Sequence, residues 1–521
     1  MSSQKKRKKK KKNKKKSVQN VNIQNSKIEN GKKGKSAQNV EKEGKEKKEK
    51  DKNKEEKNNK NKVIDEQKEK NKKAKILKIA IRTLIAFIIL LTIYMSYFII
   101  HKSQNKKNVF DGIENKEAYL TEYIVYGTNL NIKGSLNLDE TDVKNVSLSL
   151  KTTDEINDKE EKLKFSKEGN DINFYLSELI NEGLDLETLN TDKYYLFIKV
   201  EFEKGKDRYY SIKNQTTYED VDYYTITKNR KNNKIDIKFD TYNLEDENIS
   251  YMYITVKDTK PPKEVYDIVL DPGHGGIDVG AQGSGYNESD LVMKFSLKIK
   301  EELEKLGLKV RLTRDGTEGN EFSGRNIYNK DGRVNITGDS KAKYVFSIHL
   351  NSCEIPDSHS GVEIYAPPKA NLTFAKSLAD NIVTYGKTDY STNSFVNYKV
   401  DDGIYVRTFS ESVIEHTNKE AIEGGYEPYN VSEETPYLFM IRETGGIATK
   451  AYTDGRNTEY GKNLYYNSNI GVEAYLLELG YINNSQEVEN IINNESGYVN
   501  GIVNAIKNEI FGNNESEDIN N

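Results

Sequence analysis

The sequence predicts an α/β domain at its C-terminal end, preceded by an all-β domain, one transmembrane helix and a disordered basic tail. Three observations support this order. Strand-like and helix-like segments alternate over residues 266–511, which is typical of a mostly parallel sheet with helices on its faces. Residues 102–258 instead show two-residue periodicity between polar turns. An apolar run within residues 79–101 separates this part from a Lys-rich beginning.

Length and composition indicate several domains. The chain has 521 residues, of which 31% are charged, and its net charge is -2. That small value hides an asymmetry, because residues 1–78 hold 31 Lys and Arg against 11 Asp and Glu, and the remainder is acidic to a similar degree. The single cysteine, Cys353, excludes an intrachain disulfide. This fits a cytosolic protein or an exported bacterial protein that does not rely on disulfides.

Residues 1–78 are expected to be a disordered cytoplasmic tail. They are rich in Lys, Asn and Glu and almost free of aromatic residues, so they cannot bury enough apolar surface to offset the chain entropy. Two interpretations stay open: a solubilising tail, and a basic arm that contacts anionic lipid headgroups. Nucleic-acid binding is not expected, because no aromatic residues are interleaved with the lysines.

Residues 79–101 are expected to form one transmembrane helix. Residues 83–100 contain no charged side chain, which is near the minimum length for a membrane span. Tyr94 and Tyr97 lie toward its far end, where aromatic rings prefer the membrane interface. A cleaved signal peptide is not expected, because the run begins far from the terminus. The lysines before the run predict a single-pass membrane protein with a cytoplasmic N-terminus and extracytoplasmic domains.

Residues 102–258 are expected to form a β-sandwich-like extracytoplasmic domain. Residues 146–150, 198–202 and 235–239 alternate between apolar and polar side chains. This part contains no histidine, so a spacer or interaction domain is favoured, with glycan binding by its tyrosines as the alternative. The sequence does not indicate its protein partners. Residues 259–265, with two consecutive prolines, are expected to be a stiff linker.

Two histidines of the α/β domain fall where strands are expected to end. His274 follows the apolar run 266–270 in a Gly-rich turn, and His349 lies near the end of the apolar run 344–350. Ligands collect at this edge of open α/β sheets. Glu288 shares a loop with His274 and precedes a predicted helix. Two His and one Glu form one of the ligand sets of an open zinc site, so we expect one Zn²⁺ in this domain.

Glu478 is the candidate catalytic residue. It lies within a third apolar strand, where a carboxylate is costly unless it is paired, metal-bound or catalytic. A zinc hydrolase needs a carboxylate that takes the proton of water and passes it to the leaving nitrogen. A hydrogen-bonded structural glutamate is the alternative. Asp278 is interpreted as a turn residue rather than as the partner of a ligand imidazole.

Five motifs follow one another in the α/β domain. They are DPGHGGIDVGA (271–281) followed by Glu288, LTRD (312–315), RVN (333–335), SIHLN (347–351) and ELGYI (478–482). In this order they resemble the motifs of the zinc-dependent N-acetylmuramoyl-L-alanine amidases of the AmiC/CwlV type. The resemblance covers residues 266–511 and implies a zinc ion held by His274, Glu288 and His349, with Glu478 catalytic. It also implies cleavage of the amide between N-acetylmuramic acid and the L-alanine of the stem peptide in peptidoglycan.

The interval between His349 and Glu478 exceeds the usual length in that family, which indicates an insertion around residues 386–470. The insertion is expected either to gate the site or to shape a substrate groove. Candidate substrate-binding residues are Asn351, Arg442 and Glu443, with an ordinary surface ion pair as the alternative for the last two. Residues 512–521 are expected to be a disordered tail.

Three functions are compatible with these features. The favoured one is a membrane-anchored peptidoglycan amidase. The second is a non-catalytic cell-wall-binding or scaffold protein that keeps the fold, which the four filled site positions disfavour. The third is a zinc peptidase, which the lack of an HExxH helix disfavours.

Overall fold

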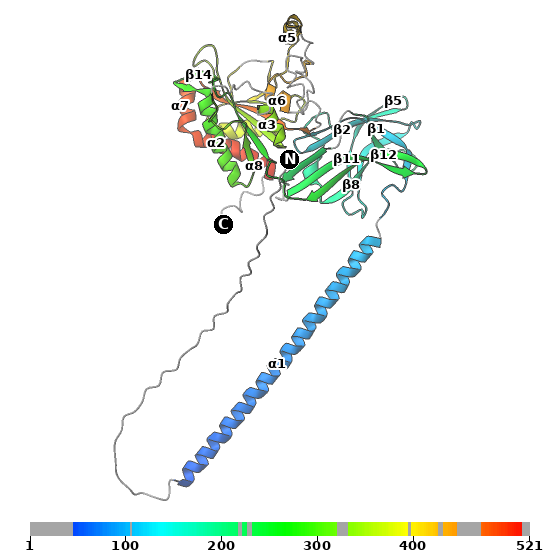
Figure 1. Ribbon diagram of the computed structural model, residues 1–521, viewed down its shortest axis with the longest axis vertical. Helices are drawn as coiled ribbons and strands as arrows, with labels where there is room; N and C mark the ends of the chain where they lie inside the picture. Colours follow the sequence, from blue (N-terminus) through cyan, green and yellow to red (C-terminus); the bar gives the residue numbers. More distant parts are fainter. Residues whose placement is uncertain are drawn as a thin grey trace, which may run out of the picture. The chain divides into compact units, whose positions relative to one another are not determined.

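The computed structural model describes residues 45–104, 107–216, 221–226, 232–319, 332–393, 397–425, 431–444 and 470–512 (Figure 1). The chain divides into two compact units between Ile99 and Ile100. The first unit contains most of one long helix, and the second contains an all-β part and an α/β part.

Helix α1 (Lys45–Gln104) corrects the boundary of the predicted tail. Residues 45–78 are helical instead of disordered, because Lys and Glu favour helices and pairs such as Glu69 and Lys73, 3.0 Å apart, stabilise a helix surface. The part Gln67–Tyr97 is long and apolar enough to cross a membrane, and its side chains are exposed. Residues 1–44 of the predicted tail lie outside the described residues.

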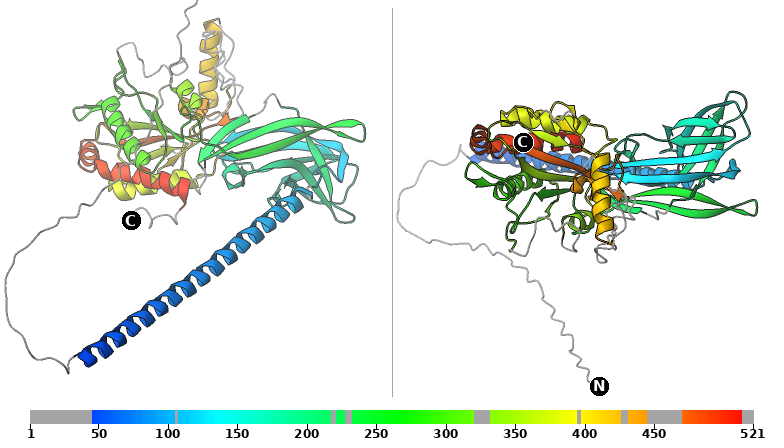
Figure 2. Two further views of the ribbon diagram at one scale, coloured as in Figure 1. Left: turned by 60° about the horizontal axis from the view of Figure 1, so that its bottom comes forward. Right: turned by 90° about the horizontal axis from the view of Figure 1, so that it is seen from above.

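The all-β part confirms the predicted strands but not two separate sheets. Its strands join a 13-stranded sheet in the order β10-β11-β12-β8-β9-β1-β2-β6-β5, with β3, β4, β7 and β21 as branches. Long strands such as β8 pair with more than one neighbour along one edge, so the sheet stays continuous. Both views of Figure 2 show these cyan-to-green strands as a strongly twisted sheet. The strands are β1 (Ile113–Tyr126), β2 (Asn129–Asn137), β3 (Val143–Lys151), β4 (Lys159–Lys162), β5 (Lys164–Glu168), β6 (Asp171–Tyr175), β7 (Leu184–Asp185), β8 (Asp192–Phe202), β9 (Arg208–Asn214), β10 (Val221–Ile226), β11 (Asn232–Leu244) and β12 (Glu247–Asp258), with the 3-10 helix η1 (Leu186–Thr188) before β8.

The α/β part contains a seven-stranded sheet in the order β16-β13-β17-β22-β18-β20-β19. The first four strands are parallel, whereas β18 runs antiparallel to β22. The sheet is therefore mixed, and its parallel half carries the predicted site. The strands are β13 (Ile268–Pro272), β16 (Val310–Leu312), β17 (Tyr344–Asn351), β18 (Glu363–Tyr365), β19 (Lys399–Asp401), β20 (Ile404–Tyr405) and β22 (Glu473–Tyr481), with a separate hairpin of β14 (Gln282–Gly283) and β15 (Tyr286–Asn287).

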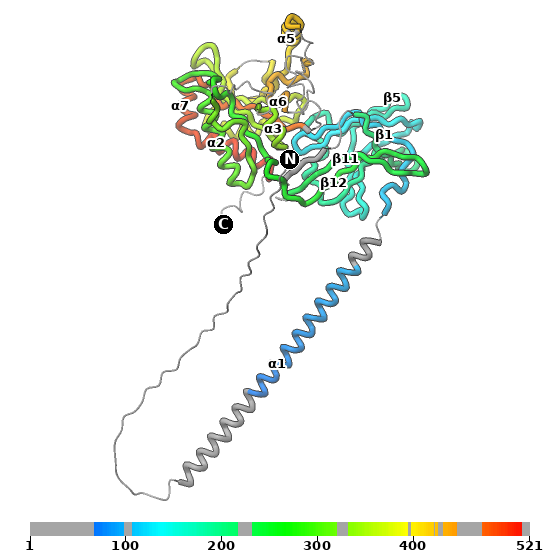
Figure 3. Tube along the Cα trace, in the orientation of Figure 1, coloured from blue at the N-terminus to red at the C-terminus, as the bar shows by residue number. Residues whose placement is uncertain are grey.

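Helices cover both faces of this sheet. Successive residues of its central strands are apolar, so each strand presents apolar side chains to both faces. Ile268 and Leu270 of β13 join the larger core with α2, α4 and α8, and Val269 joins a smaller core with α3 and α6. Figure 3 traces α2 (green) against the red α8, where Lys294 lies 3.0 Å from Glu495. The helices are α2 (Glu288–Lys305), α3 (Arg333–Asp339), α4 (Thr373–Gly386), α5 (Glu411–Glu423), α6 (Phe439–Thr444), α7 (Ser485–Asn493) and α8 (Glu495–Phe511).

Parts of the insertion and of the linker pack against the α/β part. Around residues 386–470, the structure describes β19, β20, α5, α6 and β21 (Ile470–Gly471), and β20 extends the sheet beside β18. Residues 394–396, 426–430 and 445–469 of this insertion lie outside the described residues. The predicted linker is not a free spacer, because the Lys309 ammonium donates to the carbonyls of Pro262 and Lys263 and Val265 is buried. Residues 513–521 of the predicted tail are not described.

Candidate active site

His274 lies in a tight turn directly after strand β13. Its φ is 59°, and Gly275 and Gly276 follow with φ of 122° and 62°, so the motif supplies glycines where the backbone must stay left-handed. The imidazole Nδ1 lies 3.1 Å from Asp278 Oδ2. Asp278 therefore holds the ring as well as the turn, whereas the sequence favoured only the turn role.

Glu288 begins helix α2 and is buried between the two histidines. Its Oε2 lies 3.0 Å from His274 Nε2, and its Oε1 lies 2.9 Å from His349 Nδ1. The backbone N–H groups of Ala281 and Leu350 also donate to this carboxylate, at 2.9 and 3.0 Å. Burial alone would raise the pKa of Glu288, but the contacts with both imidazoles outweigh it and lower the pKa. The carboxylate is therefore held in its anionic form.

The three side chains could hold one metal ion. One ligand atom from each of His274, Glu288 and His349 lies within 4.8 Å of the others. Two ligands of a tetrahedral zinc ion stand about 3.4 Å apart, so the distances of 2.9 and 3.0 Å leave little adjustment to make. Glycines make room for the rings: a Cβ on Gly273 would lie 2.3 Å from His349, and one on Gly280 would lie 2.7 Å from His274. The donor set and the space both fit a small divalent cation.

Glu478 lies beside His349 on the neighbouring strand. The two residues are register partners in the parallel pair β17–β22. The Oε2 atom of Glu478 is buried without a hydrogen-bond partner among the residues that the structure describes. Burial, then the charges of Glu288 and Glu363, raise the pKa of Glu478 well above its usual range. This side chain can hold a proton beside the candidate metal position.

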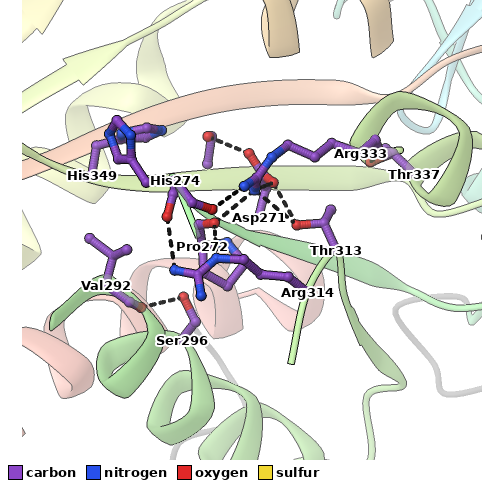
Figure 4. A network of polar contacts seen from close by, with 12 residues as sticks. Asp271, Pro272, His274, Val292, Ser296, Thr313, Arg314, Arg333, Thr337 and His349 are labelled. Carbon is purple, nitrogen blue, oxygen red and sulfur yellow. Dashed lines mark hydrogen bonds and ion pairs between the residues drawn. The ribbon is translucent and has the colours of Figure 1, made fainter. Parts of the chain in front are cut away.

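A buried polar network lies beside the His274 turn (Figure 4). Asp271 and Arg333 are each 1% exposed, and Arg333 Nη1 lies 2.6 Å from Asp271 Oδ1. The hydroxyls of Thr313 and Ser347 also donate to Asp271, at 2.6 and 2.7 Å. Arg333 reaches onward to the carbonyls of Pro272 and His274. The network therefore connects the ligand-bearing turn with helix α3, with strand β17 and with the residue that follows strand β16.

Arg314 supports the same turn from its other side. Its Nε donates to the Pro272 carbonyl at 2.9 Å, and its Nη2 donates to the carbonyls of Gly273 and Ser289 at 2.8 and 2.7 Å. It thereby connects the turn of His274 with the first turn of α2, which carries Glu288. The sequence alone indicated no role for Asp271, Arg314 and Arg333. The only sign of such a role was that these polar residues lie at strand and helix ends. Because Asp271 and Arg333 are 62 positions apart, the sequence did not show that they pair.

Glu363 forms a second buried network on the far side of Glu478. It is the register partner of Glu478 across β18 and β22 and is 0% exposed. The Tyr365 and Ser391 hydroxyls donate to it at 2.8 and 2.7 Å, and the Tyr481 hydroxyl and the Asn393 amide donate as well. Ser391 and Asn393 belong to the insertion, so the insertion contributes to the wall beside Glu478.

The candidate substrate-binding residues differ in their placement. Asn351 ends strand β17 and is partly exposed at the same sheet edge as His349. Arg442 and Glu443 are each 4% exposed and form an ion pair with 2.7 Å between Arg442 Nε and Glu443 Oε1. Both the substrate-contact and the surface-pair interpretations need correction, because α6 packs against β22 and buries the two side chains. Arg442 also donates to the carbonyl of Tyr437, at 2.6 Å.

The fold and the candidate metal position define a class of protein: an α/β domain with two His and one Glu near the carboxyl ends of parallel strands. Residues 268–425 match the family described as N-acetylmuramoyl-L-alanine amidase. The family match therefore covers part of the C-terminal domain. The match includes His274, Glu288 and His349 and ends before Glu478.

Relatives are similar over part of their length. The germination-specific N-acetylmuramoyl-L-alanine amidase of Bacillus subtilis (strain 168) is 33% identical over 126 residues, which are 22% of this chain and 52% of the relative. The N-acetylmuramoyl-L-alanine amidase AmiA of Escherichia coli (strain K12) is 34% identical over 116 residues, 22% of this chain and 37% of the relative. The chain thus spans about half, or less, of the length of these curated relatives.

A solved structure is similar as well. The catalytic domain of CwlV, an N-acetylmuramoyl-L-alanine amidase from Bacillus (Paenibacillus) polymyxa var. colistinus, matches with 20% identity and a TM-score of 0.30. The match covers 47% of this chain and 98% of that one.

Proposed function

We propose that residues 266–511 are a zinc-dependent N-acetylmuramoyl-L-alanine amidase that hydrolyses the amide between N-acetylmuramic acid and L-alanine in peptidoglycan. One observation carries the proposal: His274, Glu288 and His349 offer ligand atoms within 4.8 Å of one another, and Glu478 is in register with His349. The family match over residues 268–425 supports the substrate class.

Each residue then has a distinct role. His274, Glu288 and His349 would hold the zinc ion, with Asp278 fixing the His274 ring. When bound, zinc polarises the scissile carbonyl and makes a water molecule more acidic. Glu478 takes a proton from the attacking water and delivers it to the leaving amide nitrogen. The register of Glu478 with His349 on the neighbouring strand supports this role.

We further propose that the chain is anchored in the cell membrane by one span, with the N-terminus in the cytoplasm and the amidase on the cell-wall side. Support comes from the apolar part Gln67–Tyr97 of α1 and from the lysines that precede it. The substrate lies outside the membrane, so this orientation brings enzyme and peptidoglycan to the same side.

The test uses the full chain in detergent with added zinc and purified cell wall. We expect release of stem peptides that begin with L-alanine, detected by labelling new α-amino groups and by mass spectrometry. Chelation should abolish the release. Glu478→Gln should lower kcat on the order of 10²-fold or more, because a positioned general acid–base contributes 10²–10⁴-fold, and it should still bind zinc. Glu354→Gln, an exposed carboxylate in the loop after β17, is the control and should stay active.

Other outcomes separate the competing functions. New amino termini within the stem peptide would indicate a zinc peptidase. Zinc binding and wall binding without any bond cleavage would indicate a scaffold protein. Failure to bind zinc at all would remove the basis of the proposal.

A further inference from the structure

The all-β part and the α/β part meet at the beginning of strand β22. Strand β21 pairs in parallel with the end of β1, with Val125 opposite Ile470 and Tyr126 opposite Gly471. The Gly127 N–H donates to the Gly471 carbonyl at 2.9 Å. The strand that carries Glu478 is therefore entered from a segment hydrogen-bonded to the all-β part.

A buried carboxylate lies at the centre of this junction. Glu473, the first residue of β22, is 5% exposed, and its Oε1 accepts a hydrogen bond from Asn181 Nδ2 at 3.0 Å. The Tyr475 hydroxyl also donates to it. The Gly127 backbone lies so close that a Cβ there would be 2.9 Å from Glu473 Oε2. Burial, against the hydrogen bonds from Tyr475 and Asn181, raises the pKa of Glu473 to about 7, as expected where water is excluded.

Two further contacts fix the same place. The Ala474 N–H donates to the Tyr126 hydroxyl at 3.3 Å. Lys343, directly before β17, lies 3.1 Å from Glu187 of the all-β part, and both side chains are almost fully buried. The Lys343 carbonyl accepts the Glu473 N–H at 2.8 Å. The junction thus contacts the first residues of two adjacent strands, β17 and β22.

Strand β22 connects this junction directly with the candidate active site. Glu473 and Glu478 are five residues apart on one strand, about 17 Å at the usual rise. The candidate metal ligands come from the turn after β13, from α2 and from β17. Glu478 is the site residue on β22, so a shift of that strand moves Glu478 relative to the metal position.

We propose that the all-β part is a positioning element of the active site, in which Tyr126, Gly127 and Asn181 enclose Glu473 and so set the placement of β22 and of Glu478. The catalytic half of this inference rests on the proposed amidase function. Gly127 and Asn181 are positioning residues and contact neither substrate nor the candidate metal ligands.

The test compares two glycines of the all-β part in the full chain. Gly127→Ala places a Cβ against Glu473, at φ 58°. Gly169→Ala has nearly the same backbone strain, at φ 62°, and its Cβ meets nothing within 4 Å. Asn181→Ala removes the hydrogen bond to Glu473, together with two hydrogen bonds between Asn181 and the backbone of Asn371, without adding an atom. The readouts are kcat, KM, bound zinc and the amide hydrogen exchange of β22.

Gly127→Ala and Asn181→Ala should lower kcat on the order of 10-fold or more, because misplacing a catalytic group by about 1 Å costs up to 10²-fold. Bound zinc and KM should stay near the parent values, and exchange should accelerate in β22 but not in β13. Gly169→Ala should match the parent. Equal kcat and equal β22 exchange in all three variants would overturn the inference. A parent without amidase activity would refute the proposed function, and the exchange of β22 would then decide the inference alone.

Discussion

Removing Arg333 should destabilise the α/β domain far more than removing an exposed cation. The guanidinium and Asp271 are each 1% exposed and lie 2.6 Å apart. Burial would raise the pKa of Asp271, but the Arg333 charge and two hydroxyl donors outweigh it and lower the pKa. Arg333→Met therefore leaves an anionic carboxylate in the interior with its hydroxyl donors but without its ion-pair partner. It also takes a donor from the Pro272 and His274 carbonyls.

The expected cost is about 3–5 kcal/mol, the usual result of breaking a buried ion pair by removing one partner. With a urea dependence of about 3 kcal/mol per M, the unfolding midpoint should fall by about 1–2 M. Far-UV circular dichroism is a suitable probe, because the chain contains no tryptophan. The double variant with Asp271→Asn should lose less than the sum of the two single changes, because the second change removes the uncompensated charge.

Lys305→Met is the matched control. Its ammonium pairs with Glu301 at 3.0 Å on an exposed face of α2, where solvent screens such pairs and they contribute little to stability. The midpoint should therefore hardly move. If Arg333→Met shifted the midpoint as little as Lys305→Met, the Asp271 network would not stabilise this domain.

Three further outcomes are expected. Gly280→Ala should weaken zinc binding about 10- to 100-fold by calorimetry, because its Cβ would meet His274 and Glu288, whereas Gly285→Ala, whose Cβ meets nothing, should not. The raised pKa of Glu473 means that the folded state binds more protons between about pH 4.5 and 7, so stability falls with rising pH by about 3 kcal/mol over that window. Glu473→Gln should remove this part of the pH dependence in urea titrations. Deleting residues 1–106 should move the protein from the membrane pellet to the supernatant, and an unchanged pellet would contradict anchoring by α1.

The sequence was sufficient for elements whose pattern is local. Helix α2 and strands β17 and β22 follow from their apolar periodicity. His274 and His349 were singled out by their positions near strand ends, and Glu478 by its place within an apolar strand. The all-β sheet was predicted less well, because strand pairing depends on contacts between residues far apart in sequence. Strand β21, for example, pairs with β1 although most of the α/β part lies between them in the sequence.

Burial of polar groups was the second limit. Arg442 and Glu443 read as surface residues because charged side chains are usually exposed, yet α6 buries them against β22. In the same way, the polar ends of motifs gave no sign that Thr313, Arg333 and Ser347 would converge on one carboxylate. Such networks depend on the tertiary structure and have no periodicity that a sequence can display.

The position of the site follows from the alternation of side chains on three neighbouring strands. On the sheet face toward α3 and α6, the side chains of each strand are apolar at its beginning and polar toward its end. The smaller core at the strand beginnings is therefore followed by the site at the strand ends. Parallel strands place their polar ends at one edge, where burial is incomplete and ligands can enter. The beginning of β22 lies at the opposite end of the strand from Glu478, so the proposed junction around Glu473 would act on the site through the strand and not by direct contact. On this face, apolar side chains are followed by polar ones on each strand: Val269 by Asp271 on β13, Val345 by Ser347 and His349 on β17, and Ala474 and Leu476 by Glu478 on β22.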